Sequence, residues 1–419
     1  MHLRKALVAA CLFWIQPAVA QAPARELFSQ INSIAKELER ISGLQLKHPV
    51  PSDYITKAKV NQFLRDRVKE VARPEEIRAE ELTLKKFGLV PPDFDLAKNT
   101  VDLLTEQAAA FYDYNKKKLF ITETTASDNQ EPVLVHELAH ALADQNFKLA
   151  RFIKQGRKSD DGSTARLAVM EGQASWLMAE YLARRTGQSL KDSPALLSMM
   201  SRMGEGSGQY PVFDQAPLYL RETLIFPYTK GMLFQHAVFV RDGKASFAEV
   251  FQRAPVSTQQ ILHPDLYFSG LSPTEPDLPQ PPKEKGWKSL VGGTMGELDH
   301  AVLIQQLGGK ALSDELSPHW RGSQFELREN RKRNRVMLLY SAEWDDEPSA
   351  QRYFQFYSGA LAKKWKHREV ENETSNEITG TGDDGRFVLR RSGKIVTSME
   401  GLTETGAVDR ETATAARVD

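Results

Sequence analysis

Two histidines and a glutamate on one short segment have the clearest potential for chemistry in this chain. Residues 134–147 read LVHELAHALADQNF, with His136 and His140 four residues apart and Glu137 directly after the first. On an α-helix, side chains four residues apart project from the same side, so both imidazoles can bind one Zn²⁺ ion. Glu137 lies about 100° around such a helix from His136, where a carboxylate can take a proton from a water molecule at the ion. The spacing is the H-E-x-x-H pattern, which predicts a metal site with a general base.

The surroundings of this pattern favour a metal site over an accidental match. Residues 133–143 are otherwise apolar, with Val-Leu-Val before His136 and alanine and leucine on both sides of His140. Polar side chains inside an apolar helix are costly unless they have a partner. A metal ion is a partner that the two imidazoles would share. The alternative is a fortuitous match to the pattern.

The third ligand of such a site is expected to be a carboxylate. A catalytic zinc site usually takes three ligands from the protein and leaves one position for water. No histidine follows His140 closely, and the only cysteine, Cys11, stands near the N-terminus. Glu171 lies in the apolar run LAVMEGQASW, where Gly172 would let a neighbouring backbone approach closely. Two alternatives remain: Glu171 faces solvent, or Glu180 on the same helix is the ligand.

Together, His136, Glu137, His140 and Glu171 resemble the gluzincin metallopeptidases, in which H-E-x-x-H is completed by a glutamate on a downstream helix. The segment MEGQA is similar to the EG-x-A form of that second element. HELAHALADQNF also resembles a group of exported bacterial proteins with HE-x-x-HA-x-x-DQ, a likeness that spans roughly residues 60–270. The resemblance implies a zincin-like fold with one Zn²⁺ on the two histidines and the distal glutamate. It also implies that an edge strand before the histidine helix lines the cleft and pairs with extended substrate.

The chain departs from that family in two places. The stretch between His140 and Glu171 is longer than in the best-known gluzincins, and the extra residues fall in the polar loop at 151–163. Ser175 stands where some relatives have an aspartate that orients the first histidine. Asp144, one turn after His140 on the same face, could supply the outer hydrogen bond to the metal ligands instead. The alternative for Asp144 is a charge at a helix end.

A peptidase of this kind also needs a hydrogen-bond donor for the oxyanion that forms at the scissile carbonyl. Tyr228 in IFPYTKG and His263 in PVSTQQILHPDLY are the candidates, because each combines a suitable side chain with neighbouring turn-forming residues. The alternative for each is a packed or loop position, which is the more common one for a histidine between leucine and proline. The scattered His300, His319 and His367 are expected to be structural.

The hydrophobic pattern predicts an α+β fold that begins with a mainly helical, zincin-like metallopeptidase domain at residues 23–271. Apolar residues recur at helical spacing in several segments, at 25–42, 55–72, 75–87, 131–148, 164–185 and most of 192–240. Pro217 and Pro227 are expected to interrupt the last of these. Before the histidine helix, AFYDYNKKKLFITET at 110–124 has two aromatic, β-branched arms around a polar tip, which predicts a small edge-strand hairpin.

A smaller α+β domain is expected at residues 286–403. The segment SPTEPDLPQPPKEK at 272–285 contains five prolines and predicts a semi-stiff, solvated linker. Beyond the linker we expect helices at 295–307 and 347–365 and strands near 323–328, 335–342, 385–391 and 394–400. Residues 404–419 lack apolar spacing and are expected to be a disordered tail.

Residues 1–22 have the composition of a signal peptide. MHLRK is basic, ALVAACLFWI is apolar, and AVAQA offers small residues for cleavage after Ala20 or Ala22. The apolar run has about half the length of a bilayer span, so no membrane span is expected. We therefore expect an exported protein, periplasmic or secreted, whose mature chain has no cysteine and no disulfide. A lipid anchor on Cys11 is the alternative.

The expected function is an exported zinc-dependent peptidase that acts on a peptide or protein substrate, with Glu137 as general base. The formal net charge is zero at pH 7, so nothing favours nucleic acid as a partner. Two alternatives remain: a metal-stabilised binding protein without turnover, and a zinc hydrolase that acts on a non-peptide bond. Residues 23–100 are long enough to act as a propeptide that covers the cleft.

Overall fold

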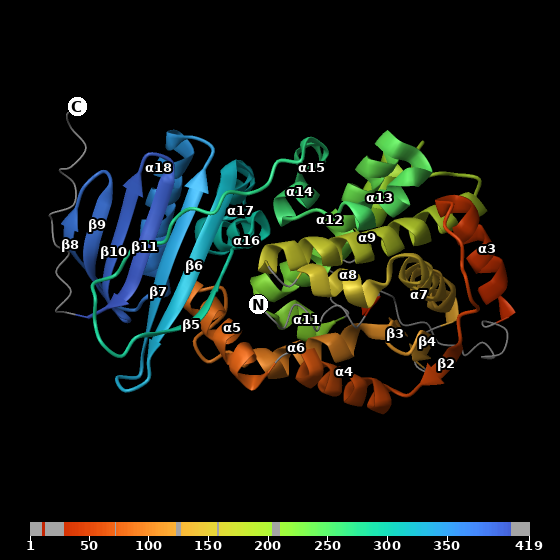
Figure 1. Ribbon diagram of the computed structural model, residues 1–419, viewed down its shortest axis with the longest axis horizontal. Coiled ribbons are helices and arrows are strands. Elements are labelled where there is room, and N and C mark those ends of the chain that lie inside the picture. Colours follow the sequence, from red (N-terminus) through yellow and green to blue (C-terminus); the bar gives the residue numbers. More distant parts are fainter. Residues whose placement is uncertain are drawn as a thin grey trace. The chain divides into compact units, whose positions relative to one another are not determined.

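The computed structural model describes residues 11–12, 29–71, 73–122, 127–156, 159–202 and 210–403. The chain divides into two compact units and has the mixed α+β composition that the sequence predicts (Figure 1). The first unit comprises Met1–Lys85 and Leu89–Ser272, and the second comprises Lys86–Gly88 and Pro273–Asp419. Most of the predicted signal peptide and the whole predicted tail lie outside the described residues. Among the described helices, none is long and apolar enough to cross a membrane.

The first unit is mainly helical. Its longer helices are α3 (Ile31–Ser42), α4 (Lys57–Val71), α5 (Pro74–Phe87), α6 (Leu96–Gln107), α7 (Ser127–Phe147), α9 (Asp160–Arg185) and α12 (Leu218–Asp242). Its shorter helices are α8 (Leu149–Gln155), α10 (Pro194–Ser201), α11 (Pro211–Gln215), η2 (Gly243–Ala245), α13 (Ser246–Gln252), α14 (Thr258–Leu262) and α15 (Pro264–Ser269). The predicted helices at 25–42, 55–72, 75–87, 131–148 and 164–185 are confirmed over the described residues, which exclude 25–28 and 72. Helix α6 was not predicted.

A small four-stranded sheet lies next to the histidine helix in the first unit. Its strands are β1 (Cys11–Leu12), β2 (Ser52–Ile55), β3 (Ala108–Asp113) and β4 (Lys118–Thr122), in the order β1-β3-β4-β2. Strands β3 and β4 pair antiparallel, which confirms the predicted hairpin. Strand β2 pairs parallel with β4, and β1 pairs antiparallel with β3. The hairpin therefore has a neighbour on each side, and both neighbours come from sequence that precedes it.

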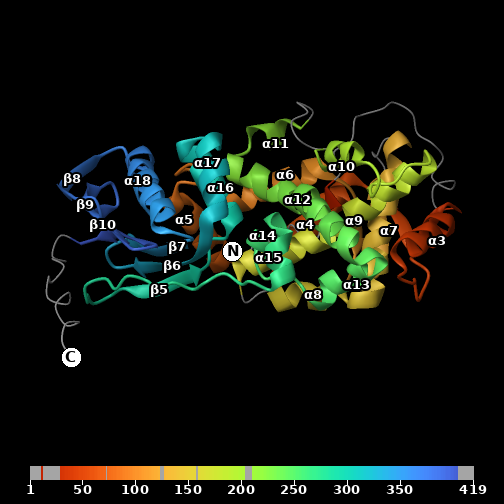
Figure 2. The ribbon, with the colours of Figure 1, turned by 90° about the horizontal axis from the view of Figure 1, so that it is seen from above.

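Helices α9 and α12 are long, lie side by side and pack tightly (Figures 1 and 2). Their closest approach is backbone to backbone, because a Cβ added to Gly172 of α9 would lie 2.1 Å from the carbonyl carbon of Gly231 in α12. The prediction that Pro227 interrupts this helix is wrong, since α12 continues through it. Proline costs a helix the hydrogen bond to the carbonyl four residues earlier, here that of Thr223, but extensive burial against α9 offsets the loss.

The second unit is built on a seven-stranded antiparallel sheet in the order β5-β6-β7-β11-β10-β9-β8. The strands are β5 (Lys288–Gly293), β6 (Trp320–Asn330), β7 (Arg335–Trp344), β8 (Arg368–Glu373), β9 (Glu377–Gly382), β10 (Gly385–Ser392) and β11 (Ile395–Leu402). Its helices are α16 (Glu297–Gly308), α17 (Lys310–Leu316), η3 (Ser317–His319) and α18 (Glu347–Lys364), and α16–α18 lie over one face (Figure 2). All predicted helices and strands of this domain are confirmed, whereas β5, β8, β9 and α17 were not predicted.

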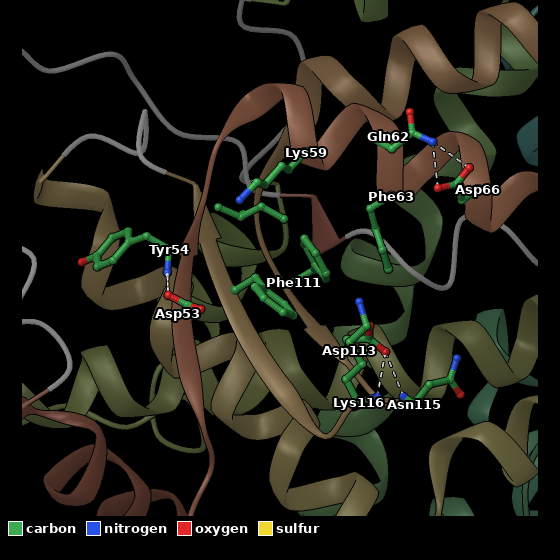
Figure 3. Close-up of a pocket in the computed structure, with 12 residues that line it drawn as sticks. Asp53, Tyr54, Lys59, Gln62, Phe63, Asp66, Phe111, Asp113, Asn115 and Lys116 are labelled. Carbon is green, nitrogen blue, oxygen red and sulfur yellow. Dashed lines mark hydrogen bonds and ion pairs between the residues drawn. The ribbon is translucent and has the colours of Figure 1, made fainter.

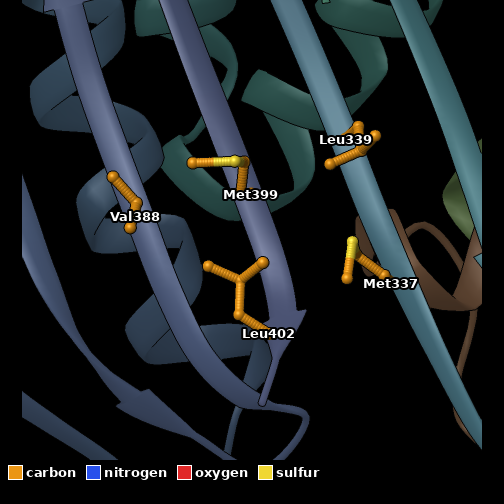
Figure 4. Close-up of a cluster of buried hydrophobic side chains, with 5 residues drawn as sticks. All are labelled: Met337, Leu339, Val388, Met399 and Leu402. Atoms are coloured by element: carbon orange, nitrogen blue, oxygen red, sulfur yellow. The ribbon is translucent and has the colours of Figure 1, made fainter. Parts of the chain in front are cut away.

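The opposite face of this sheet carries its own apolar cluster (Figure 4). The cluster consists of five buried side chains from β7, β10 and β11, namely Met337, Leu339, Val388, Met399 and Leu402. Leu278 of the proline-rich segment and Trp287 pack against it, and Thr274 forms a β-bridge with Gly322 of β6. The segment predicted to be a solvated linker is therefore part of the second unit, because it covers apolar surface that would otherwise face water.

Candidate metal centre

Helix α7 is surrounded by the fold of the first unit along its central turns. Every residue from Val133 to Asp144 is buried, and the apolar ones among them are at most 4% exposed. It packs against α9, α3 and strand β3. A helix that is apolar all round is expected to be buried, so the sequence around the H-E-x-x-H pattern accounts for its central position. The polar residues of the pattern are therefore held away from bulk water.

The structure brings His136, His140 and Glu171 together. The two histidine Nε2 atoms are 3.0 Å apart, and each lies 3.2 Å from Oε2 of Glu171. All three residues are buried, with exposed fractions of 1%, 4% and 1%. Among the described residues, this is the one group of three histidine, cysteine or acidic side chains that could hold a metal ion. The predicted third ligand, Glu171, therefore faces the imidazole pair from α9.

The shape of this triad fits a tetrahedral metal ion. Ligand atoms about 2.0–2.1 Å from Zn²⁺ in a tetrahedron are about 3.3 Å from one another. The three observed separations of 3.0, 3.2 and 3.2 Å form a nearly equilateral triangle close to that size. Hydrogen bonds alone explain it less well, because one N–H cannot point along two edges of a triangle at once. Three ligand atoms that converge on one point leave a fourth position for water or substrate.

The charges of the triad stabilise its carboxylate. Burial by itself raises the pKa of Glu171, but the charge of His140 and hydrogen bonds from both histidines outweigh it and lower that pKa to about 2. For His140, burial is the largest influence and lowers the pKa, but the charge and hydrogen bond of Glu171 and the charges of Glu137 and Asp144 together raise it overall. Burial dominates for His136 and lowers its pKa to about 4. Glu171 is thus an anion and His136 a neutral imidazole at pH 7, the forms that bind a metal.

Glu137 follows His136 on α7 and is fully buried. Burial has the largest effect on the pKa of His140 and lowers it, and Glu171 has the next largest and raises it. The charge of Glu137 comes after these and also raises the pKa of His140. The carboxylate is therefore close to the triad without being one of its three ligand atoms. This is the position that the sequence predicts for a base.

Tyr228 lies beside the triad on α12. Its ring stacks on the ring of His136, with the centroids 6.1 Å apart and the planes inclined by 24°. Gly231, one turn further along α12, contacts Gly172 of α9, the residue after Glu171. Tyr228 and Glu171 thus both lie next to His136, on two helices that meet at this glycine contact. Gly231 was not predicted as part of the site, because its partner is distant in sequence.

Asp144 links helix α7 to the hairpin. Its carboxylate accepts hydrogen bonds from the Tyr112 hydroxyl at 3.0 Å, from Lys117 Nζ at 2.6 Å and from the Leu149 backbone N–H at 3.0 Å. Burial first, and then Asp144 itself, raise the pKa of Tyr112, so the hydroxyl stays protonated and donates. These hydrogen bonds hold β3 and the hairpin turn on α7. The charge of Asp144 also helps to raise the pKa of His140, although burial, which lowers this pKa, and Glu171, which raises it, have larger effects.

Sequence reasoning missed Tyr112 and Lys117. Lys117 adopts a φ of +55°, unusual for a residue with a side chain, at the turn between β3 and β4. The three consecutive lysines at the hairpin tip were the available signal. Each binds a different carboxylate: Lys116 is 3.7 Å from Asp113, Lys117 bonds to Asp144, and Lys118 is 3.0 Å from Asp53.

Three further residues considered in the sequence are not members of the triad. His263 is half-buried at the junction of α14 and α15 and does not belong to the triad. Glu180, the alternative third ligand, accepts hydrogen bonds from Arg184 Nε at 2.7 Å and from the Leu190 N–H at 2.8 Å. It therefore stabilises the end of α9 and the turn that follows it. In the second unit, buried His300 bonds to Tyr340 at 2.6 Å.

Comparisons with known proteins add no family to this picture. No family model matches the chain, and neither a curated protein nor a solved structure shows significant similarity to it. The structure therefore supports a mixed α+β protein with a buried His-His-Glu group that could bind a metal.

Proposed function

We propose that this protein is a zinc-dependent peptidase, with the metal held by His136, His140 and Glu171 and with Glu137 as the general base. The observation that carries the proposal is the near-equilateral triangle formed by two Nε2 atoms and one Oε2 atom in a buried site. Two imidazoles and a carboxylate are a ligand set found in catalytic zinc sites, which keep a fourth position open. A Zn²⁺ ion there would polarise a carbonyl and lower the pKa of a water molecule.

Glu137 supplies the proton transfers in this proposal. Its carboxylate takes a proton from the attacking water and gives it to the amine that leaves as the peptide bond breaks. A metal site that served only to stabilise the fold would have no need for this buried carboxylate beside the ligands, because burying a charge is costly. Glu137 therefore favours an enzyme over a metal-stabilised binding protein.

The β-hairpin supports a peptide as the substrate. Strand β3 packs on α7 and is held there by the bond from Tyr112 to Asp144. Its outer edge is the one away from β4. That edge pairs antiparallel with an extended segment of the chain itself, Cys11 opposite Ala110 and Leu12 opposite Ala108. An edge that pairs with an extended backbone can recognise a polypeptide through main-chain hydrogen bonds. This property favours a peptide bond over a non-peptide bond as the target.

The place of action belongs to the same proposal. The basic, apolar and small-residue pattern of residues 1–22 supports export, so we propose that the peptidase works in the periplasm or outside the cell. In the exported enzyme, the segment that contains Cys11 and Leu12 would be removed, and the outer edge of β3 would be open to substrate.

Replacing Glu137 with glutamine tests the mechanism. We expect Glu137→Gln to lower hydrolysis of a labelled unfolded protein roughly a hundred- to ten-thousandfold while bound zinc stays at the wild-type level. Glu131→Gln is the matched control, because Glu131 lies near the start of the same helix and pairs with Arg185 and Tyr181 of α9. It should keep full activity. Full activity in Glu137→Gln, or zinc-loaded wild type without turnover, would overturn the proposal.

A further inference from the structure

A pocket lies on the face of the small sheet away from helix α7. It has a volume of about 500 Å³ and is formed by α4, β2 and the β3–β4 hairpin (Figure 3). Side chains alternate between the two faces of a strand. Tyr112 reaches Asp144 on α7, whereas its neighbours Phe111 and Asp113 line the pocket. The pocket is therefore separated from the metal centre by the sheet and is a distinct site within the usual size range for ligands.

Three phenylalanine rings form the apolar wall of this pocket. Phe63 of α4 stacks on Phe111 with centroids 4.4 Å apart and planes inclined by 15°, and Phe111 stacks on Phe120 at 5.1 Å. Figure 3 shows Phe63 reaching from its helix toward the Phe111 ring of the strand. Phe111 is buried, whereas Phe63 and Phe120 are half-buried. The outer rings thus offer flat aromatic surface to a ligand.

The protein's own lysines show which chemistry this wall attracts, since Lys118 Nζ lies 5.3 Å from the Phe120 centroid. Lys116 Nζ lies 5.9 Å from the Phe63 centroid and 5.8 Å from the Phe120 centroid. It is also 3.7 Å from the carboxylate of Asp113, yet the lysine side chain is 64% exposed. Cations within about 6 Å of an aromatic face are attracted to it. The rings and Asp113 therefore form a cation site in which Lys116 is only loosely held.

One carboxylate of the pocket remains for an incoming cation once the lysine pairs are assigned. Asp53 is paired with Lys118 and Asp113 with Lys116, which leaves the carboxylate of Asp66. The exposed Asp66 accepts hydrogen bonds from the Gln62 amide, so its carboxylate is accessible at the pocket. An incoming cation can exchange the neutral amide for a stronger, charge-assisted pair.

We propose that this pocket binds the arginine side chain of a partner polypeptide, displacing the ammonium group of Lys116. A guanidinium is planar, stacks on aromatic rings and pairs with a carboxylate through two parallel N–H groups, whereas an ammonium does neither. The outer phenyl rings supply the stacking surface and Asp66 supplies the carboxylate. Binding needs neither the metal ion nor hydrolysis, so it holds or fails independently of the peptidase proposal.

Fluorescence anisotropy with matched peptides tests this binding. The probe is a fluorescein-labelled Gly-Gly-Arg-Gly-Gly amide, compared with the same peptide containing citrulline, which has the shape of arginine without its charge. Glu137→Gln protein serves as the background, so that the probe stays intact. We expect the arginine probe to bind roughly three- to tenfold more tightly than the citrulline probe. Equal affinity for the two probes would overturn the proposal.

Three variants locate the binding in the pocket. Asp66→Asn should weaken the arginine probe roughly three- to tenfold, and Phe63→Leu roughly two- to fivefold, with thermal melts to verify folding. Lys116→Met should strengthen binding, because it removes the competing ammonium. The control is Asp314→Asn, which alters an exposed aspartate of the second unit, 62% exposed and paired with Lys310. Weaker binding in Lys116→Met, or no effect of Asp66→Asn, would place the cation elsewhere and refute the assignment.

Discussion

Glu137 and Glu171 are both buried carboxylates, but their neighbours suit them to different tasks. Glu171 is within 3.2 Å of two imidazoles, which keep it anionic and place its oxygen at the point where the three ligands meet. Glu137 is on the same helix as those imidazoles, rotated away from their common side. In the proposed mechanism, Glu171 therefore binds the metal ion, and Glu137, beside the ligands, transfers a proton.

The Tyr228 hydroxyl is predicted to stabilise the oxyanion. The ring stacks on His136, so Tyr228→Phe keeps this contact and removes only the hydroxyl. We expect kcat to fall roughly ten- to a thousandfold with little change in KM, because the hydroxyl would act on charge that develops in the transition state. Steady-state kinetics on a peptide substrate measures both constants.

Bound zinc separates this role from a structural one. Zinc content should stay at the wild-type level in Tyr228→Phe, because the residue is not a ligand. An unchanged kcat would show that the hydroxyl has no part in the reaction and would leave the ring as a packing element only.

At the scale of elements, the position of the candidate site depends on the close approach of α9 and α12. A Cβ at Gly231 would lie 2.2 Å from the carbonyl oxygen of Ala168, one turn before Gly172. Real side-chain atoms do not tolerate such a distance, so the helices would have to separate. Because Glu171 is on one of these helices and Tyr228 on the other, separation would disturb both.

We therefore predict that Gly231→Ala destabilises the protein and weakens zinc binding. The strain of overpacking should cost about 1–3 kcal/mol of unfolding free energy, measured by urea denaturation. Gly359→Ala is the matched control, since Gly359 lies in helix α18 with nothing within 4 Å of an added Cβ. This change should stabilise the protein by about 0.5–1 kcal/mol, because alanine favours helix over glycine. Equal effects of the two substitutions would contradict the account of the crossing.

The elements that bear the triad could be predicted from the sequence because their signals are local. The spacing of apolar residues predicted α7 and α9. Glu171 could be singled out because it is a charged residue in the apolar run of α9. Strand β2 was missed because it is short and gains its stability from pairing with β4, far along the chain. The contact of Gly172 with Gly231 and the bonds from the hairpin to Asp144 were missed for the same reason, since spacing along a chain does not reveal distant partners.

At the scale of the whole molecule, the chain has two units, each with its own buried polar group. In the second unit, His300 Nδ1 lies 2.9 Å from the Gly296 carbonyl oxygen and its Nε2 lies 2.6 Å from the Tyr340 hydroxyl. A neutral ring satisfies both contacts, by donating at one nitrogen and accepting at the other. Burial lowers the pKa of His300 to about 4, although the Gly296 carbonyl and Asp299 oppose this effect.

The free energy of unfolding of this unit should therefore decrease as the pH is lowered. Between pH 6.5 and about 4, the unfolded chain binds a proton at this histidine and the folded chain does not. The lowered pKa thus leaves the free energy of unfolding nearly unchanged at pH 7 and reduces it by up to about 3 kcal/mol near pH 4. Calorimetric melts of wild type and His300→Gln across this range measure the effect. The difference between the two proteins should shrink as the pH falls, and a constant difference would contradict the prediction.

The most direct test of the central claim is zinc bound per chain in wild type and Glu171→Ala, measured by mass spectrometry of the metal after dialysis. We predict about one zinc per wild-type chain and a loss of stoichiometric zinc in Glu171→Ala, because two imidazoles alone hold the ion weakly. Glu137→Gln, measured alongside, should retain the metal. Wild type without stoichiometric zinc, or Glu171→Ala that keeps it, would contradict the assignment of this triad.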